Sequence, residues 1–268
     1  MITHSREERL RLPQVTVCAI TSVNVKATLR ALEASLAQIA FAECLLFTDA
    51  DLLSRDPEIR IVPIERIGSS EAYSDFLLNR LVDHIETSHC LVVQWDGHVL
   101  NAACWKSTFL NYDYIGASWP QFDDGYDVGN GGFSLRTRRL MEACRAPEFR
   151  QIHPEDLAIG RANRELLEGQ GIRFPSRDLA NSFSVERTGN LHESFGYHGV
   201  FNMPQALGAE AFWKIYSELD NRDTVHHDFK SIFQDVRGGP GGRGRAIRLL
   251  KDRLFYALRK RRLSAKEH

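Results

Sequence analysis

The feature that most constrains the fold is the alternation of short apolar runs with segments of helical spacing in the N-terminal part of the chain. Runs of this length, rich in β-branched side chains, are typical of buried strands. Four are expected to be strands, at residues 15–21, 44–48, 59–64 and 90–94. Between them, residues 25–40 and 74–85 have the apolar spacing of helices. Strands that alternate with helices form βαβ units, so we expect an α/β fold with a mixed, mainly parallel sheet in a three-layer α/β/α sandwich.

Beyond the fourth expected strand the pattern is less regular. Residues 112–119 are expected to form a further strand. Residues 128–141 begin with a run of glycines, which is expected to open a helix. Another helix is expected over residues 153–167, because a proline and two acidic residues stand at its start.

The C-terminal segment has a composition of its own. Glycine-rich residues 238–244 indicate a linker, so we expect a folded domain of residues 13–236, followed by a linker and a basic helix in residues 237–268. That last segment has eleven Lys or Arg residues against two acidic ones, with apolar residues at helical spacing. Such a helix suits an anionic membrane surface; the structural alternative is a helix packed on the domain with a solvated basic face. Nucleic acid is not an expected partner.

Composition indicates an ordinary globular protein, with 43% hydrophobic and 26% charged residues. The five cysteines are odd in number and widely spaced, which favours reduced thiols over a disulfide framework or a zinc site. No apolar run approaches the roughly 20 residues that span a bilayer. We expect a cytoplasmic protein, either dissolved or peripheral on the inner face of the cell membrane.

Ligand-binding side chains are expected where the parallel strands end, because open α/β sheets bind ligands beyond the carboxyl ends of their strands. Thr21, Asn24, Asp49 and Asp96 lie at such positions. The chain contains neither G-x-G-x-x-G nor G-x-x-x-x-G-K-[ST] in a strand–turn–helix. A dinucleotide dehydrogenase and a P-loop enzyme are therefore not expected.

Two motifs in the middle of the chain favour a site for a phosphorylated ligand. Asp96 leaves a buried strand and is followed by glycine, where its carboxylate could hold Mg²⁺ or Mn²⁺ beside a diphosphate. The alternative is an aspartate that caps a turn. The run 129–133 has three glycines in five residues, which lets a ligand approach the backbone, although a tight turn without a ligand has the same composition.

Two further motifs favour acid–base chemistry. Glu155 and Asp156 follow Pro154, and one of these carboxylates could act as a general base. The alternative is the usual chemistry of a helix start. His198 lies between Tyr197 and Gly199, where a ligand could come close, although a single histidine is more often structural.

The order of these motifs resembles the GT-A glycosyltransferases, and specifically a bacterial and fungal GT-A-like family known only as a domain of unknown function. The spacing of the glycine run and of Glu155-Asp156 is also similar to that of inverting β-1,3-galactosyltransferases. The segments that carry the resemblance are 94–97 (QWDG), 113–119 (DYIGASW), 128–136 (VGNGGFSLR), 154–156 (PED) and 195–199 (FGYHG).

The resemblance implies a GT-A-like, Rossmann-like fold and a glycosyltransferase that uses a nucleotide-sugar donor. Asp156 then corresponds to the catalytic base, with Glu155 beside it, and Asp96 and His198 to ligands of Mn²⁺ or Mg²⁺. The implied donor-binding residues are Thr21, Asn24, Asp49, Gln94, Trp95, Asn130, Gly131 and Gly132. The implied acceptor is a glycan or a lipid-linked sugar of surface polysaccharide or glycoconjugate synthesis.

One departure from the family pattern affects the metal. The first acid of the D-x-D motif is Gln94 here, so metal dependence is expected to be weak or absent. In that case Arg136 or Arg177 is expected to neutralise the leaving diphosphate. The alternatives are a non-catalytic carbohydrate- or nucleotide-binding protein and a nucleotidyltransferase.

Overall fold

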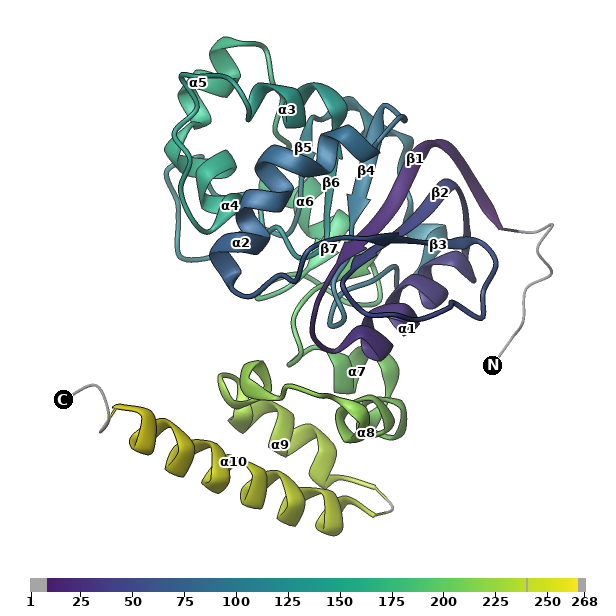
Figure 1. The fold of residues 1–268 in the computed structure, drawn as a ribbon, viewed down its shortest axis with the longest axis vertical. Helices are drawn as coiled ribbons and strands as arrows, with labels where there is room; N and C mark the ends of the chain where they lie inside the picture. The colour runs from purple at the N-terminus through teal and green to yellow at the C-terminus, as the bar shows by residue number, and fades with distance from the viewer. Residues whose placement is uncertain (1–8, 240, 265–268) are drawn as a thin grey trace. The chain divides into compact units, whose positions relative to one another are not determined.

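A computed structural model describes residues 9–239 and 241–264, and it divides into two compact units (Figure 1). The first unit extends to His198 and the second begins at Gly199. The boundary predicted at residue 237 falls within the second unit, between two of its helices, and the predicted domain 13–236 stays a prediction.

The first unit contains a six-stranded sheet in the order β3-β2-β1-β4-β6-β5. The strands are β1 (Leu10–Ile20), β2 (Ile39–Thr48), β3 (Ile59–Pro63), β4 (His89–Val92), β5 (Tyr114–Ile115) and β6 (Ser134–Thr137). Strands β1 to β4 pair in parallel, whereas β6 is antiparallel to both β4 and β5. The prediction of a mixed, mainly parallel sheet is confirmed.

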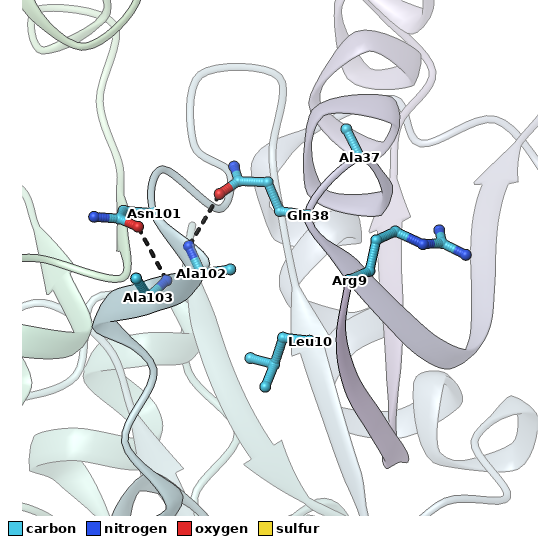
Figure 2. Close-up of a pocket in the computed structure, with 7 residues that line it drawn as sticks. All are labelled: Arg9, Leu10, Ala37, Gln38, Asn101, Ala102 and Ala103. Carbon is cyan, nitrogen blue, oxygen red and sulfur yellow. Dashed lines mark hydrogen bonds between the residues drawn. The ribbon is translucent and has the colours of Figure 1, made fainter. Parts of the chain in front are cut away.

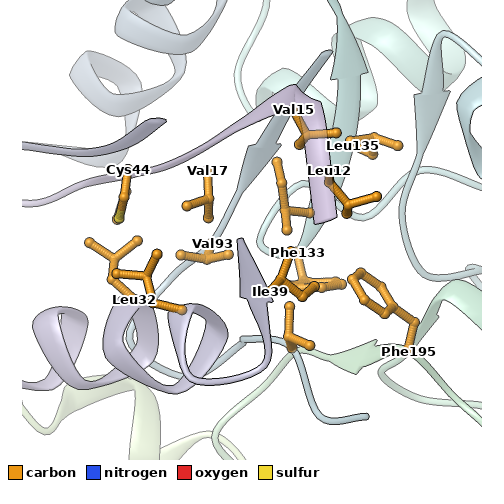
Figure 3. Packing of buried hydrophobic residues seen from close by; sticks show 14 of the residues in the cluster. Leu12, Val15, Val17, Leu32, Ile39, Cys44, Val93, Phe133, Leu135 and Phe195 are labelled. Atoms are coloured by element: carbon orange, nitrogen blue, oxygen red, sulfur yellow. The ribbon is translucent and has the colours of Figure 1, made fainter. Parts of the chain in front are cut away.

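Two core clusters cover the two faces of the sheet. Successive residues of β1 point to opposite faces, as a strand requires: Val17 packs in one cluster and Cys18 in the other. Leu32 of α1 (Val25–Leu36) and Phe183 of α6 (Arg177–Phe183) belong to the first cluster, part of which is drawn in Figure 3. Phe76, after α2 (Ser70–Asp75), belongs to the second. The chain is therefore the three-layer sandwich that was predicted.

Shorter elements complete the first unit. A π-helical turn, η2 (Phe76–Arg80), and a 3₁₀ turn, η3 (Leu81–His84), continue α2. The remaining elements are η4 (Ala102–Cys104), η5 (Ser107–Asn111), α3 (Arg138–Ala143), α4 (Glu155–Leu157), η6 (Ala158–Ala162), α5 (Arg164–Gly169) and the parallel pair β7 (Ser184–Val185) and β8 (Gly196–Tyr197).

The structure corrects several expected elements. The expected helix 25–40 ends at Leu36 and its last two residues begin β2, whereas the expected strand 112–119 is limited to Tyr114–Ile115. The glycine run was predicted to open a helix, but it leads into strand β6, and α3 begins only at Arg138. Leu135 and Arg136 of β6 pair with Leu91 and Cys90 of β4. Thr137 then caps α3, because its hydroxyl accepts a hydrogen bond from the Leu140 amide. Sheet pairing thus prevails where the local sequence favoured a helix start.

The second unit is helical. Its elements are α7 (Met203–Leu207), α8 (Ala209–Glu218), η7 (Asp223–His226), α9 (Phe229–Arg237) and α10 (Gly242–Ser264). Gly242 and Gly244, predicted to be linker, lie in the first turn of α10. In the part of the chain that the structure describes, no helix is both long and apolar enough to cross a bilayer.

Candidate functional site

The carboxyl ends of the parallel strands bring the N-terminal candidates to one edge of the sheet. Thr21 follows β1, and its amide donates to the Phe47 carbonyl of β2 at 2.9 Å. Asn24 is buried in the left-handed region at φ 55° and precedes α1. Asp49 is exposed directly after β2, on the side of β1 that faces away from β4. These three predicted donor-binding residues therefore share the predicted edge, with Asp49 farther from β4 than the other two.

The turn after β4 brings Asp96 to His198, more than one hundred residues later in the chain. Gln94 and Gly97 close this turn through two backbone hydrogen bonds, of 3.3 and 3.1 Å, and Trp95 is half-buried within it. A Cβ at position 97 would lie 2.8 Å from the Tyr197 carbonyl oxygen, so glycine is required for the two segments to touch. His198 Nε2 consequently lies 3.7 Å from Asp96 Oδ1.

A chain of side-chain hydrogen bonds fixes the His198 imidazole. Nε2 lies 3.2 Å from the Gln94 amide oxygen, and the Gln94 amide nitrogen donates to the Tyr73 hydroxyl at 2.9 Å. On the other side of the ring, Nδ1 lies 3.3 Å from Glu186 Oε1. Asn130 donates to the second oxygen of Glu186 at 2.9 Å. Gln94, Asn130 and His198, all predicted site residues, therefore form one connected cluster.

Two members of this cluster were missed from the sequence, Tyr73 and Glu186. Tyr73 lies in α2, and Glu186 directly follows the two-residue strand β7. Neither residue stands in a sequence motif that indicates chemistry. Glu186 lies near His198 because the pairing of β7 with β8 aligns Val185 with Tyr197.

Charge around His198 favours its protonated form. Burial lowers the pKa of His198, but the carboxylates of Asp96 and Glu186 more than offset this and raise the pKa to about 9. Asp156 contributes in the same direction to the pKa of His198, so its carboxylate lies within electrostatic range of this cluster.

The paired glycines 131 and 132 connect the histidine cluster to the acidic pair. A Cβ on Gly132 would lie 2.0 Å from His198 Nε2. A Cβ on Gly131 would lie 2.3 Å from Glu155 Oε1 and 3.3 Å from the Cβ of Asp156. Consecutive residues of one backbone thus touch both halves of the site, and neither position has room for a side chain.

Glu155 is turned away from solvent and toward a buried cation. Its Oε1 accepts from Arg136 Nη2 at 3.0 Å, and the two side chains are 7% and 1% exposed. The Ser74 hydroxyl donates to Oε2 at 3.3 Å and accepts from the Glu155 amide at 3.2 Å. Glu155 is therefore placed to position its neighbour rather than to meet a substrate.

The Arg136 pairing also corrects an expectation about charge. Arg136 was expected to neutralise a leaving diphosphate if no metal did so, but it is bound to Glu155. Arg177 is likewise bound to Asp127 and to the Phe122 carbonyl. Both guanidinium groups therefore have protein partners and stabilise the fold rather than face a diphosphate.

Asp156 has the properties of a general base. Its side chain is half-buried, and Oδ1 accepts from the Leu157 amide at 2.8 Å. Burial, followed by the neighbouring Glu155 carboxylate, raises the pKa of Asp156 to about 7, against the smaller opposing effects of the Leu157 and Gly131 amides. A carboxylate with this pKa is basic enough to accept a proton from a hydroxyl group while it is ionised at neutral pH.

The cluster offers three donor atoms for a divalent cation. Among the described residues, no group of three or more His, Cys, Asp or Glu side chains could hold a metal. Gln94 Oε1 and Asp96 Oδ1 nevertheless lie 3.2 and 3.7 Å from His198 Nε2. Neighbouring ligands of an octahedral ion are about 3 Å apart, and metal-bound histidines commonly donate their other N–H to a carboxylate, as Nδ1 faces Glu186. These three residues fit part of the coordination shell of a cation, on condition that His198 releases its Nε2 proton, because its raised pKa of about 9 favours the protonated ring.

A separate hollow of about 420 Å³ lies at the opposite end of the strands (Figure 2). It is lined by Arg9 and Leu10 at the start of β1, by Ala37 and Gln38 before β2, and by residues 101–103. Gln38 accepts from the Ala102 amide at 2.9 Å. None of the predicted site residues lines this hollow.

Comparison with known proteins identifies a family but no characterised relative. The family model described as "Protein of unknown function (DUF5672)" matches residues 56–198. No curated protein matches the chain significantly.

Three solved structures resemble the chain at low sequence identity. One is a glycosyltransferase involved in glycosylation of the major capsid protein of PBCV-1, with a TM-score of 0.46 and 10% identity over 76% of this chain and 98% of that one. Another is an active-site mutant of LgtC, with a TM-score of 0.39 and 14% identity over 77% and 96%. A third is the mannosyltransferase PcManGT from Pyrobaculum calidifontis, in complex with GDP-Man and Mn²⁺, with a TM-score of 0.39 and 12% identity over 91% and 80%.

Proposed function

The chain belongs to the DUF5672 family of unknown function, and we propose that it is a glycosyltransferase that moves a sugar from a nucleotide-sugar donor to an acceptor hydroxyl. One observation carries the proposal. Gly131 and Gly132 join a carboxylate whose pKa is raised to about 7, Asp156, to the cluster of Gln94, Asp96 and His198. A base for the acceptor and a group of ligands for a cation beside the diphosphate would then lie on either side of one stretch of glycine backbone.

Asp156 is the base in this mechanism. Its ionised carboxylate takes the proton of the acceptor hydroxyl as that oxygen attacks the anomeric carbon of the donor sugar. A single displacement of this kind inverts the configuration at that carbon. The buried Arg136–Glu155 pair holds the start of α4, and thereby the Asp156 carboxylate, in place.

The donor is proposed to lie along the carboxyl edge of the sheet. Thr21 and Asn24 hold the nucleoside, with Asp49 at the outer edge, and Gln94 and Trp95 continue the edge in the turn after β4. The sugar is proposed to lie beside Asn130, Gly131 and Gly132. The Asn130 amide is bound to the Ala117 carbonyl and the Gly132 amide to the Asn130 side chain, so these bonds hold the backbone at this place rather than the sugar.

The diphosphate is proposed to lie at the cluster around His198. Mn²⁺ or Mg²⁺ bound there by Gln94, Asp96 and His198 would supply positive charge beside the leaving diphosphate. Only one of these three side chains is a carboxylate, so we expect the cation to bind weakly until a substrate oxygen completes its coordination.

Two other functions make different use of the same residues. A non-catalytic sugar- or nucleotide-binding protein is the second candidate, because Gln94 occupies the position of the first acid and is engaged with Tyr73 and His198. A nucleotidyltransferase requires several carboxylates around two metals, and the described residues contain no such group. We further propose that the enzyme works in the cytoplasm on a glycan or lipid-linked acceptor.

The test is hydrolysis and transfer with a panel of nucleotide sugars, with and without Mn²⁺. Wild-type protein should release nucleoside diphosphate from at least one donor. Asp156→Asn should lose about 10² to 10⁴ of that rate while donor affinity, measured by calorimetry, stays within a few-fold. Donor binding without turnover in the wild type would instead establish the non-catalytic function.

A further inference from the structure

Helix α10 has two apolar faces, and the second unit covers only one of them. Ala246 and Leu249 are 6% and 0% exposed on the covered face, where α10 runs beside α9 and η7 (Figure 1). Asp252, half-buried on the same face, accepts from the Tyr216 hydroxyl at 2.6 Å. This inner face accounts for the attachment of α10 to its own unit.

The outer face of α10 carries large apolar side chains in the open. They are Ile247 (55% exposed), Leu250 (50%), Leu254 (61%), Phe255 (70%) and Leu258 (46%). At 3.6 residues per turn they fall within roughly 140° of the helix circumference. Of the seven large exposed hydrophobic residues in the described structure, five are on this one helix face. Exposed apolar side chains gathered on one helix face in this way indicate an interaction surface.

Charge on and around the outer face has one sign. Arg243, Arg248, Lys251 and Arg259 are exposed among and beside the apolar residues. Asp252 is the one acidic residue between Gly242 and Ser264, and it points to the inner face. Apolar side chains with cations among and beside them complement a lipid bilayer whose interior is apolar and whose surface is anionic. The same face of a second copy would instead bring like charges together.

We propose that α10 binds the surface of an anionic lipid bilayer. The helix lies parallel to the membrane, with Leu254, Phe255 and their apolar neighbours among the acyl chains. Arg248 and Arg259, at the border of the apolar arc, then lie at the level of the lipid phosphates, and Lys251, which emerges within the arc, reaches them along its flexible stem. Each basic side chain adds to the affinity. This binding does not depend on the proposed transferase activity, because none of the site residues belongs to α10.

The test is sedimentation of the full chain with vesicles of phosphatidylcholine alone and of phosphatidylcholine mixed with phosphatidylglycerol. The wild type should bind the mixed vesicles and should release them as salt is raised. The double variant Leu254→Asp/Phe255→Asp should bind about tenfold or more weakly, because it removes two apolar side chains from the lipid. Arg248→Glu/Lys251→Glu should lose about tenfold or more through charge alone.

Matched controls separate this face from general effects of the substitutions. Leu53→Asp removes a leucine that is 94% exposed in the first unit, and Lys106→Glu reverses an exposed charge there. Both should bind as the wild type does, and circular dichroism should show unchanged helix content in every variant.

Three results would overturn the proposal. The first is equal binding to neutral and anionic vesicles, and the second is equal loss in the Leu53→Asp control. The third is a wild-type chain that does not bind vesicles of either kind. Such a chain would instead form a dimer that Leu254→Asp/Phe255→Asp abolishes, or bind an RNA oligonucleotide through Arg248 and Lys251. A dimer would make a second copy the occupant of the face, and the oligonucleotide would make it a nucleic acid.

Discussion

Replacing Gly132 by alanine tests whether the two halves of the site depend on one stretch of backbone. The added Cβ would lie 2.0 Å from His198 Nε2, 2.4 Å from Cδ2 and 2.5 Å from Cε1. The imidazole must retreat until these contacts reach at least about 3.4 Å, which is a displacement of roughly 1 Å or more. His198 cannot make that movement and keep its distances of 3.2 Å to Gln94 Oε1 and 3.3 Å to Glu186 Oε1.

Two quantities should change together in Gly132→Ala. Overpacking of a buried site costs about 1 to 3 kcal/mol of the free energy of unfolding, to be measured by urea denaturation. Displacement of a ligand-positioning group by about 1 Å should lower kcat/KM for the nucleotide sugar by about 10²-fold. Gly169→Ala is the matched control, because a Cβ there has no atom within 4 Å and lies on an exposed helix position.

A double variant shows whether the clash itself is responsible. His198→Ala removes the ring, so adding Gly132→Ala to it should cost little further stability, and the two changes should be strongly non-additive. Activity should stay low in the double variant, because His198 is missing. Additive stability losses, or a Gly132→Ala protein with wild-type activity, would refute the argument that the glycine is there to admit the imidazole.

Three further predictions concern the charged groups of the site. Because the pKa of Asp156 is raised to about 7, transfer should increase as pH rises through 7. Between about pH 4 and pH 7 the folded protein keeps the Asp156 proton, whereas the unfolded chain has released it. The contribution of this group to the free energy of unfolding should therefore be lost as pH rises toward 7. Urea titrations at several pH values should show this decrease in the wild type and not in Asp156→Asn. Glu155→Ala leaves Arg136 buried without its carboxylate and should lower the free energy of unfolding by about 3 to 5 kcal/mol, whereas exposed Glu165→Ala should change it by less than about 0.5 kcal/mol. Gln94→Glu places a second carboxylate about where the amide oxygen lies, 3.2 Å from His198 Nε2, and should tighten Mn²⁺ binding by tenfold or more in calorimetry; an unchanged affinity would mean that Gln94 does not face the cation.

The sequence was sufficient to predict the parallel part of the sheet and the edge at which the candidate site residues gather. Each of β1, β2, β3 and β4 contains a short apolar run that was predicted as a strand, although β1 and β2 begin five residues before the predicted starts. A parallel sheet places the carboxyl ends of such strands together. The candidate positions that follow from this rule, Thr21, Asn24, Asp49 and Asp96, could accordingly be predicted from local pattern alone, and their roles stay predictions. The convergence of Asp96 with His198 required the order of motifs, because no local signal relates residues so far apart.

Long-range pairing decided the features that the sequence did not reveal. Strand β6 has the local composition of a helix start, and it becomes a strand because β4 and β5 offer it hydrogen bonds on both edges. Glu186 lies next to His198 only because β7 pairs with β8. The pairing of β6 with β4 and β5, and of β7 with β8, depends on which segments meet in the folded unit. The packing of the whole unit decides this, and the residues of one segment alone do not.

Gln94 shows how a site can depart from a family pattern and remain a coherent unit. An amide can donate and accept at once, and Gln94 does both: its nitrogen reaches Tyr73 and its oxygen faces His198. A carboxylate could not donate to the Tyr73 hydroxyl, and it would add a third negative charge to a cluster that already holds Asp96 and Glu186 around one imidazole. The glutamine thus lowers the charge available to a cation while it preserves the geometry that holds His198 against Gly132. In the proposed mechanism, a cation at this site depends on the substrate for the oxygens that a second acid would have supplied, so cation binding and donor binding should be strongly coupled.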